Sequence, residues 1–128
     1  MMSNVPTFLN GLVVGVILFQ TAIIAPTVFR GLGPDQAGPF LRKVFPKFFV
    51  VLVVMGITGT ISALASGASY QLWVSLITST LGLLAYLLIP MTNKSRDEGN
   101  EKLFKKLHNA SVSMTVLILV VNLFGSAL

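Results

Sequence analysis

The chain contains no cysteine and few charged residues. Charged side chains make up 10% of its 128 residues, whereas soluble domains carry about 25%. A soluble globular domain is therefore excluded. The absence of cysteine also excludes disulfides, thiolate metal sites and thiol redox chemistry. Hydrophobic residues make up 54% of the chain, which is typical of an integral membrane protein.

Acidic side chains are missing from every long apolar run. The four acids are Asp35, Asp97, Glu98 and Glu101, and all lie in polar segments. Proton-coupled exporters of similar size need a carboxylate inside the membrane, and this chain does not supply one. Phosphate-binding glycine loops, zinc-ligand spacings and nucleophile elbows are also absent from the sequence. We therefore expect a protein that is not an enzyme and holds neither a metal nor a cofactor.

Four apolar runs are long enough to cross a bilayer. A helix needs about 20 residues to span the hydrocarbon core, and such runs lie at about residues 8–29, 45–66, 72–90 and 103–125. The first run lacks a preceding basic region, so we expect a retained span and not a cleaved signal. The pattern predicts an all-α polytopic membrane protein, with a single four-transmembrane-helix bundle over residues 1–128.

The nine Lys and Arg residues lie in two short stretches, Arg30 to Lys47 and Lys94 to Lys106. This placement indicates membrane topology and not binding to nucleic acid. Each stretch has the pattern of a basic amphipathic helix at the membrane surface, and the first is a short interfacial helix that enters the second span through Pro46. The residues expected at the lipid headgroups or interface are Arg42, Lys43, Lys47, Lys102, Lys105, Lys106, Tyr70 and Trp73.

The positive-inside rule predicts the orientation of the bundle. The N-terminus, the middle loop and the C-terminus carry no Lys or Arg. We therefore expect both termini on the extracytoplasmic side and both basic loops in the cytoplasm. A bacterial inner membrane fits this pattern, as does a eukaryotic organelle membrane, and the expected partner is a bilayer with anionic headgroups.

Local signals predict where helices begin. The Gly- and Pro-rich run from Arg30 to Pro39 is typical of a turn, and Pro39 suits the first position of the next helix. Ser95-x-x-Glu98 has the form of a capping box, which predicts the start of the last helix.

Small residues predict the faces on which the helices pack. Gly11 and Gly15 form a Gly-x-x-x-Gly pair in the first span, for which simple close packing is the common explanation. The same role is expected for Gly56, Gly59, Ala63 and Gly82. Gln20 projects from the opposite face of the first span, where a side-chain amide needs a partner. It is expected to face another helix or a second subunit, which makes a homo-oligomer a candidate assembly.

A polar stripe on the last span is the most suggestive group of residues. His108, Ser111, Thr115 and Asn122 fall within about 60° of one another by the helical period. Gln20, Ser79 and Tyr86 from other spans are expected to meet this stripe across the core. Hydrogen bonds that join helices, typically worth about 0.6 to 2 kcal/mol each, explain the stripe as well as a pocket does. As the only histidine, His108 cannot build a bis-histidine haem or a histidine-rich copper site within one subunit.

Three functional hypotheses follow. The first is transport, permeation or binding of a small molecule through the polar core. The second is a structural or interaction protein whose basic helices dock on anionic lipid or partner helices. The third, a membrane enzyme using His108 as acid or base, has less support. A water-accessible cavity reaching His108, Tyr86 and Gln20 favours the first hypothesis, and a dry, fully bonded core favours the second.

Three segments resemble the transmembrane protein 205-like family, whose bacterial members carry the domain of unknown function 4149. These segments are Ala25-Pro26-Thr27-Val28-Phe29, Val44-Phe45-Pro46-Lys47-Phe48-Phe49 and Phe104-x-x-Leu107-His108-x-x-Ser111. Where the family motif has an asparagine seven residues after the histidine, this chain has Thr115. The resemblance implies a helical membrane bundle and brings no settled reaction or substrate.

Overall fold

A computed structural model describes residues 4–127, which are helical apart from short connections. α1 (Val5–Leu18) continues through the π-helical segment η2 (Phe19–Ile24) into α2 (Ala25–Gly31), and α3 (Pro34–Ser66), α4 (Ser69–Asp97) and α5 (Glu101–Ala127) follow. Four helical stretches are long and apolar enough to cross a membrane: Val5–Gly31, α3, α4 and α5. The predicted all-α fold with four candidate spans is confirmed.

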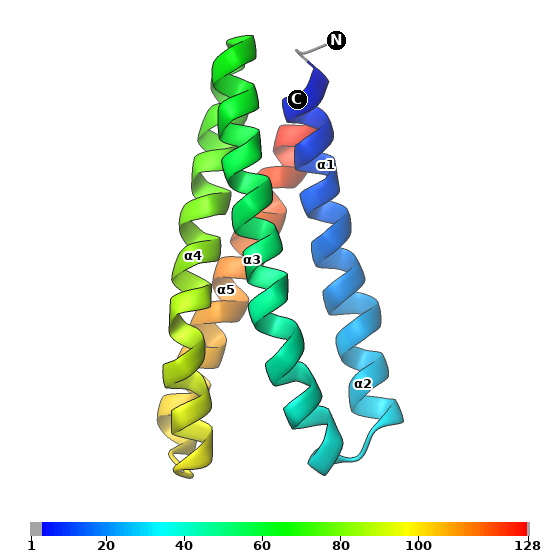
Figure 1. The fold of residues 1–128 in the computed structure, drawn as a ribbon, viewed down its shortest axis with the longest axis vertical. Helices are drawn as coiled ribbons and strands as arrows, with labels where there is room; N and C mark the ends of the chain where they lie inside the picture. The colour runs from blue at the N-terminus through cyan, green and yellow to red at the C-terminus, as the bar shows by residue number, and fades with distance from the viewer. Residues whose placement is uncertain (1–3, 128) are drawn as a thin grey trace.

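The four long stretches form one elongated bundle. α3 and α4 run side by side, α1 lies on the other side of α3, and α5 crosses behind them (Figure 1). α1 begins and α5 ends at the same end of the bundle, while the α2–α3 and α4–α5 connections lie at the opposite end. The Lys and Arg residues flank these two connections, so we call this opposite end the basic end.

Helices α3 and α4 extend further than the sequence signals indicate. α3 begins at Pro34 and not at Pro39, so the predicted turn is mostly helical, and Pro39 and Pro46 both lie inside α3. Its first turns are held by packing, since Ala37 and Leu41 form a buried cluster with Val28 of α2. The basic interfacial segment is therefore the first part of one continuous helix.

The predicted capping box at Ser95 is wrong. Ser95 is still inside α4 and donates its hydroxyl to the Thr92 carbonyl at 2.7 Å. Asn100 performs the capping instead, because its side-chain oxygen accepts a hydrogen bond from the Leu103 backbone N–H at 3.2 Å. The last helix therefore begins at Glu101, directly after this asparagine.

Small residues bring α3 and α4 into close contact. A Cβ added at Gly56 would lie 2.7 Å from the Ser79 backbone nitrogen, and one added at Gly82 would lie 3.2 Å from a Val53 methyl. Gly59 faces Ser75 in the same way, and Ala63 is 1% exposed. Because the backbones nearly touch, this helix pair is the most tightly constrained part of the bundle.

Helix α1 packs through a different face from the one that its glycines predict. It buries Asn10, Val13 and Ile17, while Gly11 and Gly15 are exposed. A Cβ added at Gly15 would meet nothing within 4 Å, so Gly15 does not pack against another helix. The larger side chains on the neighbouring face form the contact by van der Waals packing, with Ile17 in the main core beside Phe48, Leu52, Ala85 and Ile118.

A π-helical segment ends α1, and Pro26 explains its position. Proline has no N–H to donate, and its ring clashes with the carbonyl four residues earlier, here that of Ala22. The wider turn avoids this conflict: the Ala25 N–H bonds to the Gln20 carbonyl, five residues back. Gln20 lies inside this segment and is buried.

Candidate functional site

Three polar side chains form a buried hydrogen-bond network near the end of the bundle where α1 begins. Asn10 of α1 donates to Asn122 Oδ1 at 3.1 Å, and Asn122 Nδ2 donates to Thr78 Oγ1 of α4 at 2.7 Å. Thr78 in turn donates to the Val74 carbonyl at 2.9 Å. All three side chains are at most 2% exposed. The network joins α1, α4 and α5 and fills the interior at this depth.

Close packing seals the network on one side. Asn10 Oδ1 has no hydrogen-bond partner among the described residues, and a Cβ added at Gly125 would lie 2.8 Å from it. The Gly125 carbonyl itself accepts from Gln71 Nε2 at 3.4 Å. The α5 backbone at Gly125 therefore lies directly over the unpaired oxygen.

Sequence reasoning placed Asn122 in the core but missed Thr78 and left Asn10 out of the candidate pocket. A signal for the Asn10–Asn122 pair exists. Asn10 lies five residues after the start of α1, and Asn122 lies five residues before the end of α5. These two helix ends share one end of the bundle, so equal spacing places the two amides at similar depth in the membrane.

The other residues of the predicted polar core do not converge on Asn122. Ser79 bonds to the Ser75 carbonyl and Thr115 to the Ser111 carbonyl, each within its own helix. Tyr86 is 39% exposed because Ala85, which is fully buried, takes the interior position beside it. Such back-bonded hydroxyls use their own donors within the helix that carries them.

His108 lies on the exposed surface of α5, near the basic end. Its ring stacks on Phe104, with the ring centroids 5.7 Å apart. Neither His108 nor Tyr86 lines the two hollows described below, whereas Gln20 lines one of them.

Gln20 is buried in a different place, beside a groove between the first span and α3. The groove has a volume of about 600 Å³ and is lined by Gly11 and Gly15 of α1, Gln20 of η2, and Lys47 and Phe48 of α3, among others. The remaining lining residues are apolar. Gln20 is only 6% exposed, and its Nε2 has no hydrogen-bond partner among residues 4–127.

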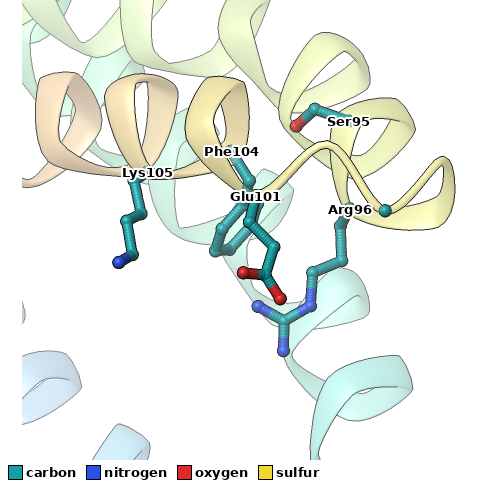
Figure 2. Close-up of a pocket in the computed structure, with 6 residues that line it drawn as sticks. Ser95, Arg96, Glu101, Phe104 and Lys105 are labelled. Atoms are coloured by element: carbon teal, nitrogen blue, oxygen red, sulfur yellow. The ribbon is translucent and has the colours of Figure 1, made fainter.

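A smaller hollow of about 390 Å³ lies at the α4–α5 connection (Figure 2). Arg96, Glu101 and Phe104 extend to the same side of this connection, and the Arg96 guanidinium carbon lies 4.6 Å from the Phe104 ring centroid. Lys105 also lines the hollow. Its charges are mixed and its aromatic ring is covered by Arg96, so these contacts fix the connection and select no ligand.

An ion pair fastens α3 to the end of α4. The two terminal nitrogens of Arg42 lie 2.6 and 3.2 Å from the Asp97 carboxylate oxygens. The hydrogen bonds from Arg42 hold the pKa of Asp97 below its ordinary value of 3.8. Arg42, predicted as a headgroup contact, is therefore engaged within the bundle. Lys43 and Lys47 are exposed.

Comparisons with known proteins identify a family. Residues 8–101 match the model described as "Domain of unknown function (DUF4149)". An "Uncharacterized protein" of Aquifex aeolicus (strain VF5) is 32% identical over 109 residues, which cover 82% of this chain and 79% of the relative. No solved structure matches.

The match agrees with the resemblance seen in the sequence. Of the three segments that carry the resemblance, two lie within the matched residues, namely Ala25–Phe29 and Val44–Phe49. The third, Phe104–Ser111, lies beyond them. The matched region covers α2, α3 and α4 and most of α1. The chain therefore belongs to the family defined by the domain of unknown function 4149.

Proposed function

We propose that this polytopic membrane protein binds a small amphipathic molecule in the groove between the first span and α3, which the molecule enters sideways from the lipid. The protein performs no catalysis in this account. Its proposed place is the bacterial inner membrane, with both termini extracytoplasmic and the basic end in the cytoplasm. The placement of Lys and Arg supports this orientation.

The observation that carries the proposal is the unpaired Gln20 amide. A buried N–H donor without a partner costs about 1 to 3 kcal/mol, so a stable structure pairs such groups. Gln20 Nε2 has no partner among the described residues and is covered by protein, and Gln20 is one of the residues that line an otherwise apolar groove, so a turn of the side-chain amide presents the donor to that groove. A hydrogen-bond acceptor on a bound molecule is therefore the expected partner.

The shape of the groove supports the same conclusion. Ligand sites typically have volumes of about 300 to 1,000 Å³, with mostly apolar walls and a few polar groups that fix orientation. The groove of about 600 Å³ has such walls, with Gln20 and Lys47 as its polar groups, but it is open on one side and not an enclosed cavity. By contrast, the interior at the level of Asn122 is filled by hydrogen-bonded side chains, which favours lateral entry over a path through the centre.

A second candidate, a structural protein that docks on anionic lipid, is favoured by one observation. The polar side chains around Asn122 bond to one another and join the helices, as expected for a purely structural core. The exposed cations lie at one end of the bundle. In this account the groove is an ordinary lipid-facing surface with no saturable site.

A single introduced cysteine separates the two candidates, because the chain has none of its own. An environment-sensitive fluorophore on Leu12→Cys reports on the groove, and the same label on Leu64→Cys, on an exposed face of α3, serves as control. Titration with monooleoylglycerol in detergent is expected to give a saturable change at position 12 alone. Adding Gln20→Leu should weaken the binding of monooleoylglycerol about fivefold, because one hydrogen bond of about 1 kcal/mol is lost. Identical, non-saturating responses at both positions would overturn the proposal.

A further inference from the structure

We propose that the occupant of the groove is an anionic glycerophospholipid from the leaflet at the basic end of the bundle. Its phosphate lies at Lys47, an ester carbonyl accepts from Gln20, and one acyl chain follows Gly15 and Gly11 toward the middle of the membrane. This inference rests on the proposed binding function and names the class of molecule bound.

The charge of the groove selects the headgroup. Lys47 is the one charged residue among those that line it, and it is exposed. In residues 4–127 the ion pairs use other cations, namely Arg42 with Asp97 and Lys94 with Glu98. Lys47 is thus available to an anionic ligand, and an anionic phospholipid offers a phosphate whose negative charge no choline cation in the same headgroup offsets.

The depth of Lys47 matches the position of a lipid phosphate. Ser66 ends α3 at the opposite end of the bundle, where the exposed aromatic residues Tyr70 and Trp73 begin α4. Interfacial aromatics of this kind mark a membrane boundary. From Ser66 to Lys47 the helix rises about 29 Å at 1.5 Å per residue, close to the hydrocarbon thickness of about 30 Å. Lys47 therefore lies at the other boundary, where headgroups begin.

Gln20 supplies the second polar contact. It lines the same groove as Lys47, and its unpaired Nε2, which protein covers in this structure, is a donor that pairs with an acceptor on the ligand once the amide turns toward the groove. In a glycerophospholipid the ester carbonyls lie directly below the phosphate and are acceptors without donors. A cation for the phosphate and an amide donor for the ester thus occur together in one groove.

Gly11 and Gly15 leave room for the acyl chain. Both line the groove, and a Cβ added at Gly15 would meet nothing within 4 Å. Along α1 these glycines lie on the far side of Gln20 from the basic end, so the space they leave extends away from that end. Phe48 and Val51 of α3 provide the opposite apolar wall.

Native mass spectrometry tests the inference. The purified protein is mixed with equal amounts of phosphatidylglycerol and phosphatidylcholine that carry the same acyl chains. One bound phosphatidylglycerol is expected, at least about fivefold in excess over phosphatidylcholine, as one cation at an anionic headgroup predicts. Lys47→Gln should remove the preference while retaining binding, and Lys47→Arg should keep it. Gln20→Leu should weaken the binding of both lipids.

Lys43→Gln is the matched control, because Lys43 lies one turn before Lys47 on α3 but does not line the groove. Lys43→Gln should leave the preference for phosphatidylglycerol unchanged, and circular dichroism should show the helical content of each variant intact.

Equal retention of both lipids, or a preference for phosphatidylglycerol that survives Lys47→Gln, overturns the inference. If monooleoylglycerol still gives a saturable fluorescence change at the label on Leu12→Cys, the proposed binding function stands without the phospholipid inference. A lipid-free dimer that separates on Gln20→Leu would overturn both, because a second copy would then fill the groove.

Discussion

Asn10 and Asn122, which are 112 residues apart in the chain, share a hydrogen bond of 3.1 Å inside the bundle. This bond joins the first helix to the last, and the Asn122 bond to Thr78 extends the connection to α4. In a membrane the hydrophobic effect does not drive helices together, so such polar contacts and close packing determine the arrangement. This contact helps to hold α1 in place, together with the packing of Val13 and Ile17 in the main core.

Asn122→Ala is expected to lower the free energy of unfolding by about 1 to 3 kcal/mol, since side-chain hydrogen bonds in membranes contribute about 0.6 to 2 kcal/mol each. The substitution removes the contacts to Asn10, Thr78 and the Ile118 carbonyl. Unfolding in mixed micelles by a denaturing detergent measures the change. Asn109→Ala, at an exposed position of the same helix, should change the unfolding free energy by less than about 0.5 kcal/mol.

Gly56→Ala is expected to destabilise the bundle by about 1 to 3 kcal/mol, the usual cost of forcing a methyl group into a packed site. The new Cβ would lie 2.7 Å from the Ser79 backbone nitrogen, so α3 and α4 must separate. Gly38→Ala on the same helix meets nothing within 4 Å and should be neutral or stabilising. The same unfolding assay compares the two variants, and an equal effect of both would contradict the close contact.

The Arg42–Asp97 pair predicts a defined pH dependence. The Asp97 pKa is lowered in the folded protein by hydrogen bonds from Arg42. The pair therefore stabilises the fold fully above the ordinary carboxyl value of 3.8 and loses this effect as the pH falls through the lower folded pKa. Carbon-13 NMR titration of labelled aspartate should place the Asp97 midpoint below 3.8. Arg42→Gln should return it to the ordinary value, and an unchanged midpoint would show that the pair does not form.

The orientation can be tested with reporters fused to the C-terminus. Alkaline phosphatase, which is active only outside the cytoplasm, is expected to be active there, and green fluorescent protein to be dark. The reason is the positive-inside rule, because Lys and Arg flank only the α2–α3 and α4–α5 connections. The opposite pattern of activity would reverse the proposed topology and place the groove lipid in the other leaflet.

The spans were predictable from the sequence because bilayer thickness and charge placement act on whole segments. Helix ends were less predictable, since packing overrides local signals. Pro39 and Pro90 lie inside helices, and Ala37 and Leu41 gain enough from packing on α2 to extend α3 to Pro34. Ser95 fits a capping pattern but stays within α4, where its hydroxyl bonds to a backbone carbonyl.

The site was only partly predictable, because the sequence does not determine how each helix is rotated about its axis. The expected packing face of α1 held Gly11 and Gly15, whereas Val13 and Ile17 face the core. Because α1 is rotated so that Val13 and Ile17 face the core, Gly11 and Gly15 line the groove. The sequence shows that Pro26 conflicts with a regular helix. It does not show that the helix resolves this conflict by a π-helical turn, which contains Gln20.

A density map of the protein in lipid nanodiscs containing phosphatidylglycerol tests the binding site most directly. The account predicts elongated non-protein density in the groove between the first span and α3, in contact with Gln20 Nε2 and reaching Lys47. No such density is expected beside Asn10, Asn122 and Thr78. A groove filled by another copy of the chain, or a Gln20 side chain bonded within its own bundle and no density beside it, would contradict the account.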